Sequence, residues 1–216
     1  MIDSSGYQFV GYASSGASGF APGGTAFATD TTIDGGFQYV GDGSGAVGTA
    51  TSTTIVNGGE QDVGDWGTGT ATDTTISSAV QDVGADQGGD GTATMTTIYS
   101  GGLQIVGLVQ ASGTATNTTI DGGVQAVGDF YGIGHATSTT INGGRQYVGY
   151  NNGTGYATDT TISGNGGSIG VEVVGYDKGG IGTATNTTID SGGAQELGSW
   201  YGTGYATGVT INSGGA

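Results

Sequence analysis

The sequence contains no cysteine, a single proline and almost no basic residues. The lack of cysteine excludes disulfides and thiol nucleophiles, so packing and hydrogen bonds must hold the fold together. Lysine and arginine together number 2 against 18 aspartate and glutamate residues, which gives a formal net charge of −16. A surface of this charge repels phosphate backbones and anionic lipid headgroups. We therefore expect no nucleic acid among the partners of the chain.

Long apolar runs are absent as well. No stretch of about 20 apolar residues occurs, so the sequence predicts no membrane-spanning helix and no direct membrane insertion by this segment. The N-terminal residues MIDSSGYQFVG lack the basic start and the apolar core of a signal peptide. We expect either that the chain is not exported or that it is a piece of a longer protein.

Glycine, by contrast, supplies 51 of the 216 residues. Such a glycine content is common in disordered proteins, but disordered segments contain few β-branched residues. Here threonine, valine and isoleucine are plentiful and recur at regular intervals. The composition therefore favours a folded repeat over disorder.

A phrase such as ATSTTINGGRQYVG, residues 136–149, occurs nine times. The isoleucine that closes its threonine-rich part recurs at a spacing of about 21–22 residues, within the range of solenoid repeats. One longer interval separates Ile162 from Ile189. Each copy continues with a turn such as NGG or DGG, a second segment of the form QxVG, and a variable tip. Threonine, valine, isoleucine and tyrosine favour strands, whereas glycine with asparagine or aspartate favours turns, so the pattern predicts two strands in each copy and no helix.

Alternation along the first strand predicts which side chains face inward. The nine residues that correspond to Ser52 include Asp, Asn, Met and Gly, a set that is tolerated only in solvent. We therefore predict that the columns of Thr51, Thr53 and Ile55, which have the opposite phase, face the core. The alanine column represented by Ala50 is then predicted to face outward.

The second strand of each copy shows the same contrast between a variable and a constant phase. The residue between Gln61 and Val63 changes freely from copy to copy, so it is predicted to face solvent. The columns of Gln61 and Val63 are predicted to face the core, with the glutamine amides bonded to one another between copies. Glu172 interrupts the glutamine column and leaves the register of its copy open.

A single copy is too short to bury its own apolar face, so successive copies must stack. The sequence thus predicts an all-β fold, a parallel β-helix or β-solenoid with one repeat of about 21–22 residues per coil and about nine coils. Residues 1–216 are predicted to form one domain. Residues 12–27 are expected to form an irregular loop or an N-terminal cap, and residues 163–172 an insertion at a corner. We also expect this domain to be a fragment of a longer array.

Residues suited to catalysis or metal binding do not form a recognisable motif. His135 is the sole histidine and lies in a variable tip, where other copies have Thr or Tyr. GGDG at residues 88–91 resembles a calcium-binding repeat, but that repeat requires a much shorter period. We predict no catalytic residue, no metal site and no cofactor. Acidic pairs like those of glycosidases leave a carbohydrate-active β-helix enzyme as an alternative.

One column predicted to face outward is identical in every copy. Its uniformity has two available causes, a threonine ladder that stabilises the sheet or a surface recognised by a regular partner. The column consists of Thr32, Thr54, Thr75, Thr97, Thr119, Thr140, Thr161, Thr188 and Thr210.

The phrases GTATDTTI, GTATNTTI, INGG and QYVG resemble the repeats of AIDA-type autotransporter adhesins, the self-associating surface proteins of Gram-negative bacteria. The resemblance extends from Tyr7 to Gly215. It implies an extracellular passenger stalk, displayed at the outer membrane, that mediates adhesion, autoaggregation and biofilm formation. It also implies O-glycosylation by a glycosyltransferase, with the uniform threonine column and Ser52 or Ser138 as the matching acceptors. The repeat of this chain departs from the family pattern in being slightly longer.

The leading hypothesis is a structural stalk that binds other copies of itself or host surface glycans and proteins. An alternative is an ice-binding β-solenoid, because such proteins present regular threonine columns on a flat face. The predicted inward orientation of Thr51 and Thr53 argues against that alternative, and Asp and Met in the intervening column interrupt the array.

Overall fold

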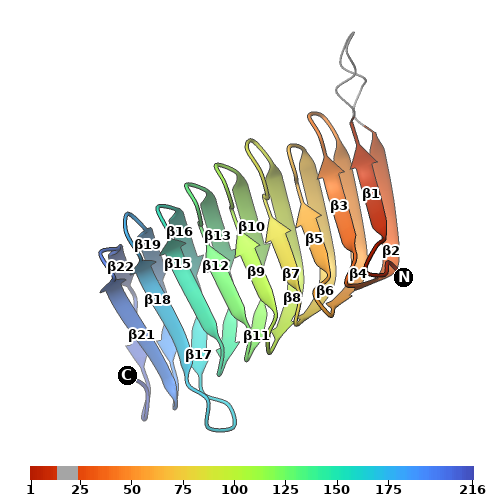
Figure 1. Ribbon diagram of the computed structural model, residues 1–216. Helices are drawn as coiled ribbons and strands as arrows, with labels where there is room; N and C mark the ends of the chain where they lie inside the picture. Colours follow the sequence, from red (N-terminus) through yellow and green to blue (C-terminus); the bar gives the residue numbers. More distant parts are fainter. Residues whose placement is uncertain (14–23) are drawn as a thin grey trace.

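The computed structural model describes residues 1–13 and 24–216 and has an all-β fold. Successive strands lie side by side across the long axis of an elongated stack, with the two termini at opposite ends (Figure 1). Within the described residues no helical segment has the length and hydrophobicity needed to cross a bilayer. Two parallel sheets account for the strands of this described part.

The first sheet is formed by the QxVG segments. In the described part of the chain it has nine strands, in the order β1-β3-β5-β7-β9-β12-β15-β18-β21. They are β1 (Tyr7–Tyr12), β3 (Phe37–Asp42), β5 (Glu60–Val63), β7 (Val80–Val83), β9 (Leu103–Val106), β12 (Val124–Val127), β15 (Arg145–Tyr150), β18 (Gly170–Tyr176) and β21 (Gly193–Ser199).

The second sheet is formed by the threonine-rich segments, and the described residues contribute 14 strands to it. The first four segments are continuous: β2 (Thr25–Asp34), β4 (Val47–Val56), β6 (Thr68–Ser77) and β8 (Asp90–Tyr99). The later ones are split into pairs: β10 (Ser112–Thr116) and β11 (Thr119–Asp121), β13 (Ile133–Thr137) and β14 (Thr140–Asn142), β16 (Thr154–Thr158) and β17 (Thr161–Ser163), β19 (Ile181–Thr185) and β20 (Thr188–Ile189), β22 (Thr203–Thr207) and β23 (Thr210–Ile211).

Neighbouring strands pair in register, so each repeat residue lies beside its counterpart. Ile55 pairs with Ile33 on one side and with Ile76 on the other, and Gln61 pairs with Gln38 and Gln81. The nine strands of the first sheet, counted over the described residues, are separated by eight steps, which correspond to about eight turns. The predicted fold class, a β-solenoid with one repeat per coil, is confirmed.

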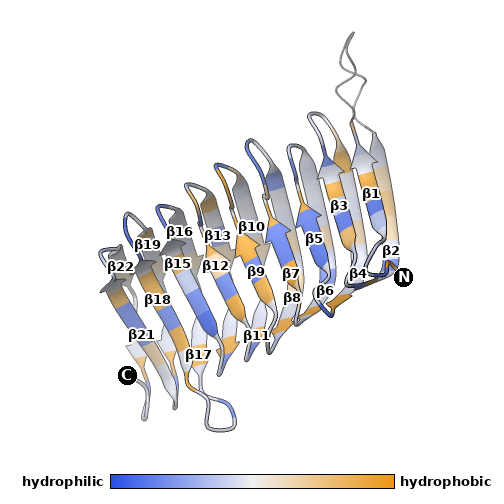
Figure 2. Cartoon of the chain, viewed as in Figure 1, coloured by the Kyte–Doolittle hydropathy of each residue, from blue (hydrophilic) through white to orange (hydrophobic). Residues whose placement is uncertain are grey.

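The interior is a set of stacked columns rather than a mixed core. The isoleucines from Ile33 to Ile189 form one cluster and are at most 1% exposed. Burial of one such side chain contributes roughly 1.5–3 kcal/mol, and each added coil repeats that contribution. Figure 2 shows hydrophilic and hydrophobic segments following one another along the strands of the 9-stranded sheet. This alternation does not separate the buried face from the exposed one, because the buried glutamines are hydrophilic.

A ladder of glutamine amides runs beside the apolar columns. Gln104 Nε2 donates to Gln81 Oε1 at 2.7 Å and to Thr96 Oγ1 at 3.1 Å. The same pair of bonds recurs for Gln61, Gln81, Gln125 and Gln146, with Gln-to-Gln distances of 2.5–2.7 Å. The rung spacing of about 4.8 Å lets each buried amide reach the next. The interior therefore accommodates glutamine because the side chains satisfy one another.

In each threonine-rich segment, the residue of the Ser52 column interrupts the alternation of inward and outward side chains. The inward positions after this residue are therefore shifted by one relative to those before it. All nine members of this column have a left-handed backbone, with φ between 52° and 68°. Before this corner Ala50 faces inward and is 1% exposed, and after it Thr53 and Ile55 are 1% and 0% exposed. Thr51, by contrast, is partly exposed. The inward orientation predicted for Thr51 and the outward orientation predicted for Ala50 are therefore corrected.

Two segments depart from the regular coil. Residues 164–169 extend outward between β17 and β18, where the Asn165 and Ser168 backbones pair (Figure 1). This segment lies within the insertion predicted for residues 163–172. Most of the loop or cap predicted for residues 12–27 falls on residues 14–23, which lie outside the described residues. The end of that predicted range, residues 25–27, already belongs to β2.

Candidate functional site

The outer face of the 14-stranded sheet is a surface of threonines. Before the corner, two columns point outward, and their members lie two residues apart in each coil. Four consecutive coils have threonine at both positions, as Thr49 and Thr51 do in β4. These threonine pairs, which we call the TxT array, are Thr49 and Thr51, Thr70 and Thr72, Thr92 and Thr94, and Thr114 and Thr116.

The geometry of the TxT array follows from the sheet. Paired coils place equivalent threonines about 4.8 Å apart, and positions two residues apart in one strand are about 6.6 Å apart. The alanine between them, Ala50 in β4, is buried. All eight threonines are partly exposed and carry no charge. In three of the four later coils His135, Tyr156 and Tyr205 replace the first threonine of the pair, whereas the coil of β19 keeps it as Thr183 and Thr185.

The uniform threonine column predicted from the sequence lies on the other side of the corner. Thr54 and Thr210 are exposed, and the other members from Thr32 to Thr188 are partly exposed. Ser52 and Ser138, at the corner itself, are exposed. The two serines are therefore accessible at the corner, and the threonine column is accessible on the segment after it, in the same sheet as the TxT array.

Aromatic side chains form short stacks on the surface. Tyr7 stacks on Phe37 at a ring-centroid distance of 5.3 Å, and Phe9 stacks on Tyr39 at 5.1 Å. His135 is exposed and stacks on Tyr156 at 4.8 Å with an interplanar angle of 9°. The sole histidine thus continues a surface column and lies against an aromatic ring.

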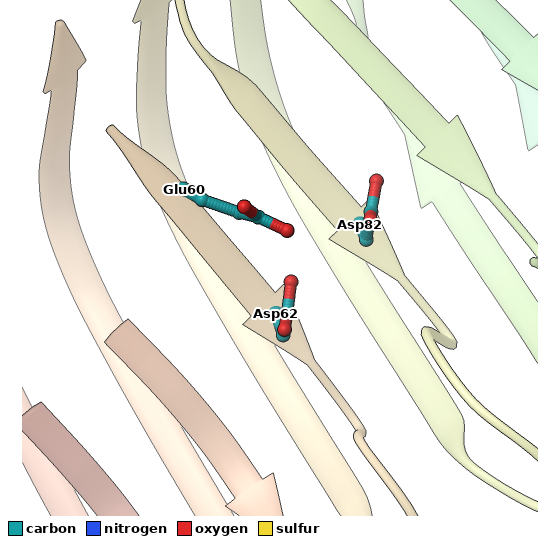
Figure 3. Close-up of side chains that lie close together, drawn as sticks. All are labelled: Glu60, Asp62 and Asp82. Carbon is teal, nitrogen blue, oxygen red and sulfur yellow. The ribbon is translucent and has the colours of Figure 1, made fainter. Parts of the chain in front are cut away.

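Three carboxylates of β5 and β7 could hold a metal ion. Glu60, Asp62 and Asp82 each offer an oxygen, and these oxygens lie within 4.8 Å of one another (Figure 3). Burial, followed by repulsion from Asp82, raises the pKa of Asp62 to about 8. Burial, followed by repulsion from Glu60, raises the pKa of Asp82 to about 7. Sequence analysis compares equivalent residues of the copies, one column at a time. It did not indicate this group, because the three acids come from two copies and from two different columns.

Sequence reasoning also missed the TxT array, because it assumed unbroken alternation along the strand. A signal for the correct phase was present in the corner column. Asp, Asn, Ser and Gly predominate there, and Asn, Asp and Gly are the residues that most readily adopt a positive φ. Their recurrence at one position of every copy indicates a left-handed corner as well as exposure to solvent.

No protein-family model matches the chain, and no curated protein matches it. Among solved structures, the chain is similar to a fragment of the autotransporter adhesin TibA, described as hyper-glycosylated in a reaction catalysed by TibC. The two are 32% identical with a TM-score of 0.52, over 98% of this chain and 84% of the TibA fragment. At this identity and coverage, the chain belongs to the family of autotransporter adhesin β-solenoids that the TibA fragment represents.

Proposed function

We propose that this chain is an AIDA-type passenger stalk, exported and displayed at the bacterial outer membrane, that mediates adhesion, autoaggregation and biofilm formation. The observation that carries the proposal is the repetition of one uncharged hydroxyl surface, the TxT array and the uniform threonine column, along an in-register rod. Each hydroxyl contact is weak, but a rod that presents many equivalent contacts binds a second rod or a glycan surface with avidity. Family membership supports the same function.

Other copies of the chain and host surface glycans or proteins are the partners that suit this surface. A threonine hydroxyl both donates and accepts hydrogen bonds, so two identical threonine faces can bond to each other. Sugar hydroxyls offer the same groups. Because the TxT array itself contains no charged residue, its contacts leave no unpaired charge buried at the interface.

We further propose that a glycosyltransferase modifies exposed hydroxyls of the chain. The hyper-glycosylation of the TibA fragment supports this proposal. The exposed hydroxyls at and beyond the corner, Ser52, Ser138, Thr54 and Thr210, are the most accessible of the acceptors that the sequence resemblance implied. Intact mass after co-expression with TibC should increase by whole sugar units, and Ser52→Ala with Ser138→Ala should reduce the number added. An unchanged mass in the presence of active TibC would contradict the proposal.

Display of the chain on bacteria without adhesins of their own tests the adhesive function. Displaying cells should settle faster than cells with an empty display system. Thr72→Lys with Thr94→Lys places two charges in the TxT array and should slow the settling. The matched control is Leu103→Lys with Val124→Lys, which adds the same charge to the outer face of the 9-stranded sheet. If displaying and empty cells settle at the same rate, the proposed adhesive function is wrong. If the two pairs of substitutions slow settling equally, the TxT array is not the adhesive surface.

An ice-binding β-solenoid is the second candidate, and one specific observation favours it. The corrected orientation places both threonines of the TxT array outward, with the variable residue of the Ser52 column at the corner beside the array. A regular array of hydroxyl groups, about 4.8 Å apart between coils and about 6.6 Å apart along a strand, can order water in two dimensions. Thermal hysteresis of the purified chain, with Thr72→Lys and Thr94→Lys as the matched variant, decides between the two functions. Hysteresis that the variant abolishes supports ice binding, and its absence in the parent chain excludes it.

A further inference from the structure

We propose that Glu60, Asp62 and Asp82 form a binding site for one Ca²⁺ ion, which bridges strands β5 and β7 on the outer face of the 9-stranded sheet. Glu60 and Asp62 lie two residues apart on β5 and therefore point to the same face. Asp82 on β7 pairs directly with Asp62. Figure 3 shows the three carboxylates converging from the two strands.

The separation of the carboxylate oxygens suits one ion of the size of Ca²⁺. One oxygen of each residue lies within 4.8 Å of the other two. Two oxygens bound to the same Ca²⁺ can be separated by up to about twice the metal–oxygen distance of 2.3–2.6 Å, which is about 5 Å. Three carboxylates supply three to six of the 6–8 oxygens that Ca²⁺ binds, and water supplies the rest. Glu60 is partly exposed, so water has access from that side.

Unpartnered buried oxygens point to a missing ligand. Asp82 is only 8% exposed, and its Oδ1 is buried without a hydrogen-bond partner. Asp62 Oδ1 is also buried without a partner. A buried carboxylate oxygen that lacks a partner is strongly penalised, because it has lost its hydration and gained nothing in return. A cation between the two strands would replace that hydration for both residues.

The chain supplies no cation of its own at this position. It has two basic residues, Arg145 and Lys178. Arg145 lies on β15, three strands away from β7. Three strand spacings amount to about 14 Å, which exceeds the Debye screening length of about 8 Å at physiological salt. Its guanidinium donates a hydrogen bond to Tyr147 Oη. Lys178 follows β18, one strand further along the sheet.

In the column between the Gln61 and Val63 columns, the other described strand pairs do not oppose two acids. Phe9 stacks on Tyr39, whereas Asp62 and Asp82 place two acids directly opposite each other. Like charges in opposed positions of a sheet are destabilising. A bound Ca²⁺ removes the repulsion that makes this pair unfavourable.

Calcium titration by isothermal calorimetry, at about 150 mM NaCl to suppress diffuse binding, tests the proposal. The parent chain should bind one Ca²⁺, with an affinity in the range of roughly 0.1–1 mM found for extracellular modules. Asp82→Asn and Asp62→Asn should each weaken binding at least ten-fold. The matched control is Asp73→Asn, which removes the same charge from an exposed corner of the neighbouring sheet. Circular dichroism shows whether each variant retains the β-sheet fold.

Terbium luminescence provides a readout of position. Tb³⁺ occupies calcium sites and emits when a nearby aromatic ring transfers energy to it, and Tyr39 is the strand neighbour of Asp62. Tyr39→Phe should reduce the luminescence of bound Tb³⁺ and leave calorimetric Ca²⁺ binding unchanged. The proposal is overturned if Ca²⁺ binding is not saturable, if Asp73→Asn weakens it as much as Asp82→Asn does, or if Mg²⁺ binds at the site and Ca²⁺ does not.

Discussion

Glu172 is the ionisable member of the interior glutamine column, and its side chain is 0% exposed. It pairs in register with Gln146 and Gln195, which resolves the register that the sequence left open. Glu172 Oε2 accepts hydrogen bonds from Gln195 Nε2 at 2.6 Å and from Thr187 Oγ1 at 3.1 Å. On the other side, Glu172 Oε1 and Gln146 Oε1 are buried without partners. A donor is missing at this step of the ladder.

Glu172→Gln is expected to stabilise the chain at neutral pH. The new amide can donate to Gln146 Oε1 and still accept from Gln195, as every regular glutamine step does. Relief of a buried unsatisfied group contributes about 1–3 kcal/mol to the free energy of unfolding. Chemical denaturation at pH 7 measures the gain. Glu196→Gln, on the neighbouring strand but exposed, removes the same charge and should change stability little. A loss of stability in Glu172→Gln would contradict this account of the ladder.

The effect of Glu172 should depend on pH with a definite sign. Burial raises the pKa of Glu172 above its ordinary value of 4.5. The folded state therefore keeps this proton to higher pH than the unfolded state does. Above pH 4.5 and up to the raised pKa, the contribution of Glu172 to stability falls as the pH rises, because the unfolded chain alone releases the proton. The advantage of Glu172→Gln over the parent chain should accordingly grow from pH 4 to pH 8. A constant difference across this range would show that Glu172 titrates normally.

At the scale of the element, the left-handed corner determines what the 14-stranded sheet presents to solvent. Eight of the nine corner residues are Asp, Asn, Ser or Gly, and Met95 is the exception, with φ of 57°. A left-handed conformation costs an ordinary L-residue roughly 1–2 kcal/mol, and Asn adopts it more readily because its short polar side chain bonds locally. Met95 is 46% exposed, so little packing offsets this cost.

Met95→Asn is expected to increase the free energy of unfolding by about 0.5–1 kcal/mol through relief of that strain. Met95→Leu is the matched control, because it keeps the strain and should leave stability nearly unchanged. Thermal unfolding of the three proteins compares them. If Met95→Asn is no more stable than Met95→Leu, then the left-handed backbone at the corner does not explain why Asp, Asn, Ser and Gly predominate there.

At the scale of the whole molecule, the charge opposes the association that the proposed function requires. A rod with a formal net charge of −16 repels a second copy at long range, although the TxT array itself is neutral. Salt shortens the range of this repulsion, since the Debye length falls from about 30 Å at 0.01 M to about 8 Å at 0.15 M.

Settling of displaying cells should therefore accelerate as NaCl rises from about 10 mM to about 150 mM. Cells with an empty display system, measured at each concentration, provide the baseline. If added salt instead disperses the aggregates, then ionic contacts hold the copies together and the neutral threonine surface does not.

The two strands in each copy, the stacking of coils and the glutamine interior could be predicted from the sequence. Across the nine internal copies the Thr53, Ile55 and Val63 columns never contain a charge, and burial imposes that restriction. The positions of Thr51 and Ala50 could not be predicted by alternation, since a single left-handed residue in each coil reverses the phase before it. The acidic group was also missed, because Glu60 and Asp82 belong to different copies and meet only through strand pairing.

The sequence by itself determined the repeat, its period and the chemistry of its columns, because stacking in register requires each coil to repeat the residues of the one before. Only the tertiary structure decided which threonines face solvent and which carboxylates share a site. Both depend on backbone geometry, namely the sign of φ at one corner and the register between strands. The residue pattern of a single strand does not contain that geometry.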